Sequence, residues 1–145
     1  MTEHDTVRLL RECDAGVKMG VSSIDDVVEH VHSGRLRKSL ADCRNEHIKL
    51  GDEINEQLRK YNDEGKEPDL MAKGMSWIKT NAKLLTTTDS DETIADLMTD
   101  GCNMGVKSLH RYLNQYKAAD ERSKDITKRL INLEERLAID IRTYL

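Results

Sequence analysis

The chain has 145 residues, of which 34% are charged and 37% hydrophobic, and its net charge is -4. It has no Phe and one Pro, and its aromatic side chains are one Trp and four Tyr. This length suits one compact domain, and we expect residues 1–145 to form it. A β-sandwich or barrel of this size normally uses more aromatic residues, Gly and Pro, so the composition favours an all-α fold.

Charge and hydropathy argue against several classes of protein. The 23 Lys and Arg are interspersed among 27 Asp and Glu, whereas nucleic-acid-binding proteins usually concentrate basic residues on one face. No apolar run is long enough for a transmembrane helix, and the acidic first residues are not typical of a signal peptide. The widely spaced Cys13, Cys43 and Cys102 indicate free thiols rather than a disulfide framework or a zinc site. We therefore expect a cytoplasmic protein with no nucleic-acid or membrane partner.

Two long amphipathic helices are expected in the first half of the chain, because apolar residues recur there in steps of three and four. The first covers about residues 5–32, and Ser33-Gly34 ends it. The second covers about residues 35–62 and ends in a polar loop that contains the single Pro. The two helices are similar in length, as the helices of a bundle should be.

A shorter amphipathic helix is expected over about residues 69–85, in the crossover between the second and third long helices. Met71 and Met75 lie on its apolar stripe, and Trp77 lies beside that stripe. These three side chains are our candidates for an exposed or interfacial apolar patch. We expect the protein to self-associate, most simply as a homodimer.

From residue 91 to the C-terminus the helical periodicity is ambiguous between one helix and two. One helix over the whole stretch would be about 80 Å long, and nothing else in the chain could cover it in a monomer. A split at Asp120, which can cap a helix, gives two helices over about 91–118 and 121–145. We favour the split, with a long coiled coil as the alternative.

A nine-residue motif occurs twice in the chain. Residues 16–24, Gly-Val-Lys-Met-Gly-Val-Ser-Ser-Ile, are matched by residues 101–109, Gly-Cys-Asn-Met-Gly-Val-Lys-Ser-Leu. A Gly inside a helix costs about 1 kcal/mol relative to Ala, which suggests that the missing side chains allow close helix packing. Apart from chance similarity, the repeat indicates that the first and third long helices hold equivalent places in two related hairpins. A small-molecule pocket between these two helices is a further possibility.

The order of elements, two helices, a crossover with a short helix, then two more helices, resembles the ferritin-like antiparallel four-helix bundle. Three short stretches carry a resemblance to small bacterial ferritin-like proteins: residues 14–16 (Asp-Ala-Gly), 72–78 (Ala-Lys-Gly-Met-Ser-Trp-Ile) and 98–105 (Met-Thr-Asp-Gly-Cys-Asn-Met-Gly). Members of that group are mostly of unknown function. The resemblance therefore implies a fold and no reaction.

A ferritin-type di-iron site takes a Glu from each of two helices and a Glu-x-x-His motif from each of the other two. In this chain the second long helix has Glu46 and His47 side by side, and the fourth has Glu134 but no His. The repeat places no acidic residue at positions 17–19 or 102–104. We therefore expect no di-iron site, no other metal or cofactor, and no catalytic residues.

His47 is the most informative polar residue, because it falls on the apolar stripe of the second helix. The simplest interpretation is a core histidine that is hydrogen-bonded to one partner, such as Glu134, a backbone carbonyl or water. The alternative is a metal or redox site formed by His47 with Cys43, Cys102 and Glu134. The sequence thus favours a bundle that acts by self-association or by binding a small molecule or protein, with a metal- or redox-linked protein as the alternative.

Overall fold

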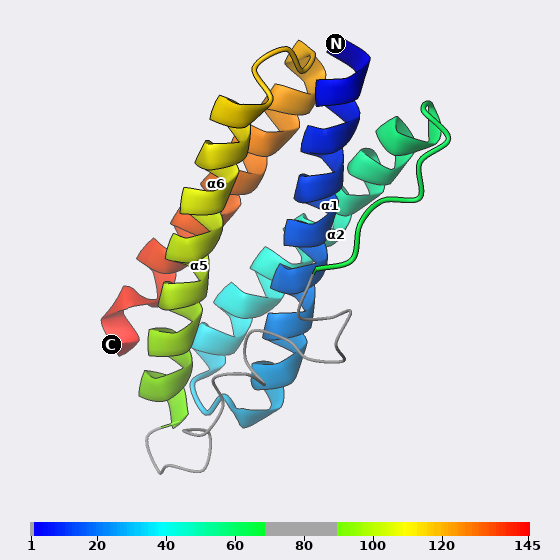
Figure 1. The fold of residues 1–145 in the computed structure, drawn as a ribbon. Coiled ribbons are helices and arrows are strands. Elements are labelled where there is room, and N and C mark those ends of the chain that lie inside the picture. The colour runs from blue at the N-terminus through cyan, green and yellow to red at the C-terminus, as the bar shows by residue number, and fades with distance from the viewer. Residues whose placement is uncertain (1, 69–89) are drawn as a thin grey trace.

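The computed structural model describes residues 2–68 and 90–145. Over these residues the fold is all-helical and contains no strand (Figure 1), which confirms the predicted all-α helical bundle. Its elements are α1 (Thr2–Val27), η1 (Val28–His30), α2 (Gly34–Arg59), α5 (Ser90–Gln115), α6 (Glu121–Ile141) and η2 (Arg142–Tyr144), where η denotes a one-turn 3₁₀ helix. The short helix predicted over 69–85, with its candidates Met71, Met75 and Trp77, lies outside the described residues.

Local capping explains where α2 and α6 begin. The Ser33 hydroxyl accepts a hydrogen bond from the Leu36 amide at the start of α2, and the Asp120 carboxylate accepts one from the Ser123 amide at the start of α6. Each cap satisfies one of the amides that the first helical turn leaves without a partner. The C-terminal stretch is therefore divided at Asp120, into α5 and α6, and is not one long helix.

All four long helices end a few residues earlier than the periodicity predicts. The first tightens into η1 after Val27 because Val31 takes an extended conformation. The second ends at Arg59 rather than near residue 62, since Asn62 adopts a positive φ of 56°. The third ends at Gln115 and the fourth at Ile141, instead of at about 118 and 145, because the apolar periodicity runs on into the turns that follow them.

Hydrogen bonds at the helix ends define which ends lie together. The Asp5 carboxylate, near the start of α1, accepts a hydrogen bond of 2.9 Å from the amide of Ala118, just after α5. The Asp91 carboxylate, at the start of α5, accepts hydrogen bonds from the amides of His32 and Ser33, in the turn after η1. The start of each of these two helices therefore lies beside the end of the other.

The core consists of two apolar clusters that occupy opposite ends of the bundle. One contains Ile24, Val27, Val31, Leu36, Leu40, Cys43, Ile94, Leu97, Met98, Cys102, Leu137 and Ile141. The other contains Leu10, Cys13, Val17, Leu50, Ile54, Leu58, Leu109, Ile126, Leu130 and Ile131. Burial of these side chains is the main stabilising term of the fold. None of the described helices is long and apolar enough to cross a membrane.

Between the two clusters, each of the four long helices contributes one residue that interrupts its apolar face. In two helices this residue is a glycine, and in the other two it is polar. These residues are Gly20 of α1, His47 of α2, Gly105 of α5 and Glu134 of α6, and their neighbours one turn away belong to one cluster or the other. We call these four residues the central layer. The middle of the bundle therefore holds two polar side chains and two glycines, which have no side chain.

Candidate functional site

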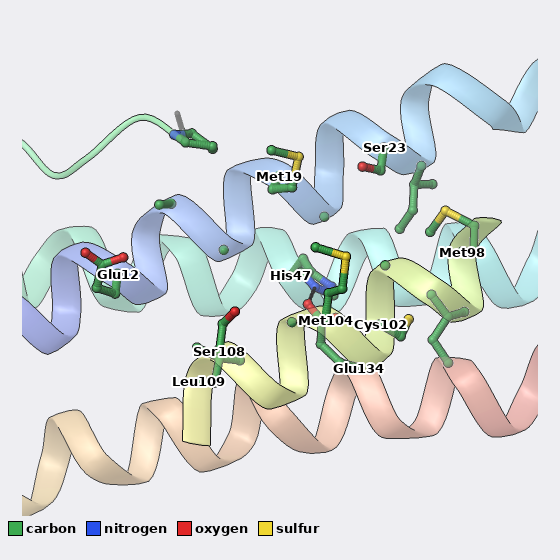
Figure 2. Close-up of a pocket in the computed structure, with 18 of the residues that line it drawn as sticks. Glu12, Met19, Ser23, His47, Met98, Cys102, Met104, Ser108, Leu109 and Glu134 are labelled. Carbon is green, nitrogen blue, oxygen red and sulfur yellow. Dashed lines mark ion pairs between the residues drawn. The ribbon is translucent and has the colours of Figure 1, made fainter. Parts of the chain in front are cut away.

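A cavity of about 380 Å³ lies at the level of the central layer (Figure 2). Most of its lining comes from α1 and α5, and all four residues of the central layer border it. The lining also includes Gly16, Met19, Ser23, Met98, Gly101, Cys102, Met104, Ser108, Leu109 and Tyr112. Three of these side chains are methionines, which adapt their shape easily to a bound molecule.

The glycines of the central layer make room for side chains from the neighbouring helices. A Cβ added to Gly20 would lie 2.8 Å from the Nε2 and Cδ2 atoms of His47, and one added to Gly105 would lie 2.6 Å from Oε2 of Glu134. These two glycines hold equivalent places in the sequence repeat. In each half of the chain, therefore, a glycine on one helix faces the polar residue of its hairpin partner. The repeat thus places a glycine where each hairpin partner brings in a polar side chain.

The imidazole of His47 is held in one orientation and is almost completely buried, with 2% of the residue exposed. Its Nδ1 lies 2.8 Å from the carbonyl oxygen of Cys43 and donates a hydrogen bond to it. Its Nε2 lies 3.6 Å from Oε1 of Glu134, which is within ion-pair range but longer than a hydrogen bond. Among the described residues Nε2 has no hydrogen-bond partner. A buried donor thus lines the cavity with its bonding capacity unused.

The charge state of His47 follows from its neighbours. Burial disfavours the imidazolium, but the contact with Cys43 and the nearby charge of Glu134 outweigh that penalty and raise the pKa of His47 to about 10. At neutral pH the central layer therefore holds a positive imidazolium opposite a carboxylate.

Two of the buried cysteines, Cys102 beside the cavity and Cys13, have raised pKa values. Burial, followed by the charges of Glu134 and Cys43, raises the pKa of Cys102 well above its usual value. Burial also raises the pKa of Cys13 to about 12, although the Thr127 hydroxyl, 3.1 Å from its sulfur, opposes the shift. Metal binding and nucleophilic attack both require the thiolate, so Cys13 and Cys102 are poorly suited to either.

The structure brings together the four residues of the alternative metal or redox site. Cys43 and Glu134 both contact His47, and Cys102 is close enough to interact electrostatically with Glu134 and Cys43. Nevertheless, within residues 2–68 and 90–145 no three His, Cys, Asp or Glu side chains are placed so that they could hold a metal ion. Their arrangement is that of an ion pair flanked by thiols.

One end of the cavity is bordered by Lys66 and Pro68, in the loop that follows α2. The buried Asp14 of α1 fixes this loop: it accepts a hydrogen bond of 2.9 Å from the Lys66 amide and forms an ion pair with Lys18. Gly65 makes the contact possible, because its φ is +92° and a Cβ there would collide with the Asp14 carboxylate. This role of Asp14 was not predicted from the sequence. The available signal was its position on the apolar stripe of α1.

No protein-family model, curated protein or solved structure matches this chain. Function must therefore be inferred from the cavity and the central layer.

Proposed function

We propose that this protein binds a small, largely apolar molecule in the cavity between α1 and α5. The observation that carries the proposal is the buried Nε2 of His47, which lines the cavity without a hydrogen-bond partner among the described residues. A volume of about 380 Å³ falls in the range of small-molecule sites, which typically combine apolar walls with a few polar groups that orient the ligand. Methionine, leucine and tyrosine side chains supply the walls here.

We propose that the fold is a ferritin-like antiparallel four-helix bundle whose central site no longer suits metal. The helix-end contacts of α1 with α5 support opposite directions for these helices. In di-iron bundles all four helices project ligands into the middle of the core. At that level this chain has two glycines, one His and one Glu. This donor set does not fit a di-iron centre, and a cavity borders it.

We further propose that the protein works without catalysis and in a reducing compartment, the cytoplasm. Its three cysteines are all free and buried, which supports such a compartment.

The proposed homodimer has its own support, in exposed apolar side chains. Ile139 and Leu145, at 55% and 57% exposure, are the large apolar side chains near the C-terminus that a partner could cover. Light scattering at micromolar concentration should give a dimer mass, and a strict monomer would remove this part of the proposal.

A metal- or redox-linked protein is the second candidate. The observation that favours it is the gathering of His47, Cys43, Cys102 and Glu134 in one neighbourhood. Elemental analysis of protein purified without chelator, beside His47→Ala, tests it. Stoichiometric iron, zinc or manganese that is lost in the variant would favour this candidate, and its absence from the native protein would exclude it.

Binding in the cavity can be measured with a neutral apolar fluorophore such as N-phenylnaphthylamine, whose emission rises when it leaves water. We expect saturable binding by the native chain. Ser108→Phe, which fills the cavity from α5, should weaken it at least tenfold, whereas Asn103→Phe, at an exposed position of the same helix, should not. Ala15→Leu fills the cavity from α1 and serves as a second variant if Ser108→Phe does not fold. Equal binding by filled and native cavities would contradict the proposal.

A further inference from the structure

We infer that the ligand is an uncharged amphiphile, an apolar body carrying one hydroxyl group that bridges His47 and Glu134. This inference rests on the proposed binding function and names the chemical class of its ligand. It follows from three features of the cavity: its balance of charge, the distance across the central layer, and the composition of its walls.

The charges that border the cavity occur in opposite pairs. His47 faces Glu134, and Lys66 forms an ion pair with Glu12. A ligand with a net charge would add an unbalanced charge to a largely apolar space, which is costly. An anion would also meet the Glu134 carboxylate, and a cation would meet the His47 imidazolium. A neutral ligand avoids both penalties.

The distance between His47 Nε2 and Glu134 Oε1 selects the polar group. At 3.6 Å the two atoms are too far apart for a hydrogen bond with each other. A hydroxyl oxygen beside the pair can accept from the Nε2–H at about 2.9 Å and donate to Oε1 at about 2.7 Å. An ether or ketone can only accept, so it would leave the carboxylate without a new donor. The hydroxyl therefore satisfies both groups at once.

The walls set the size and shape of the apolar body. Met19, Met98 and Met104 approach the cavity from α1 and α5 (Figure 2). Flexible thioether side chains favour a range of apolar shapes over one rigid outline. An alcohol with an alkyl chain of medium length therefore fits the site, and the length of the chain is less selective than the polar group.

The test compares four octyl compounds that differ only in the polar group: n-octanol, methyl octyl ether, octylamine and octanoate. Each competes with N-phenylnaphthylamine for the native chain of residues 1–145 at neutral pH. We expect n-octanol to bind about tenfold more tightly than the ether, because it makes one more charge-assisted hydrogen bond, and more tightly than either charged compound. In His47→Phe the difference between alcohol and ether should disappear, while in the exposed-site control His110→Phe it should persist.

The possible results separate the inference from the proposed function. If octylamine, octanoate or the ether binds as tightly as n-octanol, the inference is wrong while binding in the cavity stands. If neither the fluorophore nor any octyl compound binds, the proposed function itself is wrong. Should His47→Phe fail to fold, the order of the four compounds on the native chain decides the inference alone.

Discussion

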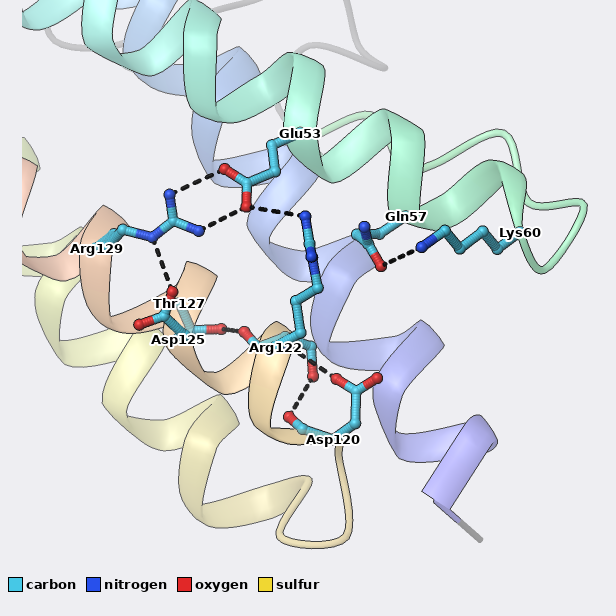
Figure 3. Close-up of polar contacts among 9 residues, drawn as sticks. Glu53, Gln57, Lys60, Asp120, Arg122, Asp125, Thr127 and Arg129 are labelled. Atoms are coloured by element: carbon cyan, nitrogen blue, oxygen red, sulfur yellow. Dashed lines mark hydrogen bonds and ion pairs between the residues drawn. The ribbon is translucent and has the colours of Figure 1, made fainter.

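Two of the ion pairs between α2 and α6, Glu53–Arg129 and His47–Glu134, differ in almost every respect. Near the protein surface, the Arg129 guanidinium donates to both oxygens of Glu53 at 2.9 and 2.7 Å and also to Asp125 at 3.0 Å (Figure 3). In the middle of the bundle, His47 and Glu134 face each other at 3.6 Å without a hydrogen bond between them. The pair with favourable geometry lies where water screens it, and the pair with poor geometry is buried.

The difference indicates that the two pairs have different roles. The Glu53–Arg129 contact is bidentate, which fixes the register of two helices, but exposed pairs add little stability. The buried pair loses the hydration of two charges, which offsets much of what the contact at 3.6 Å returns, so well-packed apolar residues would stabilise this bundle about as well. Its donor and acceptor instead border a cavity, where a ligand can use them.

The largest effect should come from removing one member of the buried pair. Glu134→Leu leaves the His47 imidazolium buried without its counter-charge, and we expect the free energy of unfolding to fall by about 3 kcal/mol. The double variant His47→Leu/Glu134→Leu should recover most of this loss, since no buried charge remains. Urea unfolding measures both. A double variant as unstable as the single one would show that the pair stabilises the fold by itself.

Raising the pH should weaken the buried pair and spare the exposed one. The folded pKa of His47 is about 10 and its ordinary value is 6.5, so its stabilising contribution is complete below about pH 6.5 and is lost as the pH rises toward 10. Among the described residues Cys43 and Glu134 are the titratable groups that contact it, and Cys102 lies near both of these. We expect the free energy of unfolding to decline between about pH 6.5 and 8.5.

The control for this decline is a pair of histidine variants. His47→Gln should remove it, whereas His110→Gln, at an exposed position of α5, should retain it. The buried thiols of Cys13 and Cys102 have raised pKa values, so they add a further loss above about pH 9 that all three proteins share. An identical pH dependence in native protein and His47→Gln would mean that His47 is neutral in the folded state.

A smaller effect is expected from adding one methyl group to the central layer. Gly20→Ala places a Cβ 2.8 Å from the ring of His47, whose Nδ1 hydrogen bond restrains it, and we expect a loss of about 1–2 kcal/mol in stability. Gly34→Ala has no atom within 4 Å of the new Cβ and should be neutral or slightly stabilising. Thermal melts compare the two, and equal effects would show that the ring has room to move.

The smallest effect should come from the exposed pair. The Arg129 hydrogen bonds are the main reason that the pKa of Glu53 is lowered, so its contribution is present at neutral pH and is lost as the pH falls below about 4.5. We expect Glu53→Gln to cost less than about 1 kcal/mol, and less still at high salt. Glu56→Gln, at an exposed position of the same helix, is the control. A loss of several kcal/mol would reverse the comparison between the two pairs.

Local signals in the sequence predicted much of the fold. The three-and-four spacing of apolar residues marks the helices, and Asp120 marks the division between α5 and α6. The ends near Val31 and Asn62 were missed because they depend on backbone angles that these residues adopt only in the folded chain.

The candidate site was predicted less well, because it depends on which residues of different helices share one level. Glu134 was among the expected partners of His47, but spacing within a helix does not determine contacts between helices. The glycines of the repeat were interpreted as points of close helix packing. The structure places Gly20 against His47 and Gly105 against Glu134, and these partners on the neighbouring helices were not predicted. The visible signal was a gap in the apolar stripe near the middle of each helix.

The most direct test of the central claim is a nitrogen-detected NMR titration of the histidine side chains, with and without n-octanol. We expect His47 to remain doubly protonated at about pH 8, because its pKa in the folded protein is about 10. We also expect the Nε2 resonance of His47 to shift when the alcohol binds, while that of His110 does not. A His47 that titrates at or below its ordinary pKa and does not respond to the alcohol would contradict the claim that the central layer is a charged, ligand-binding pair.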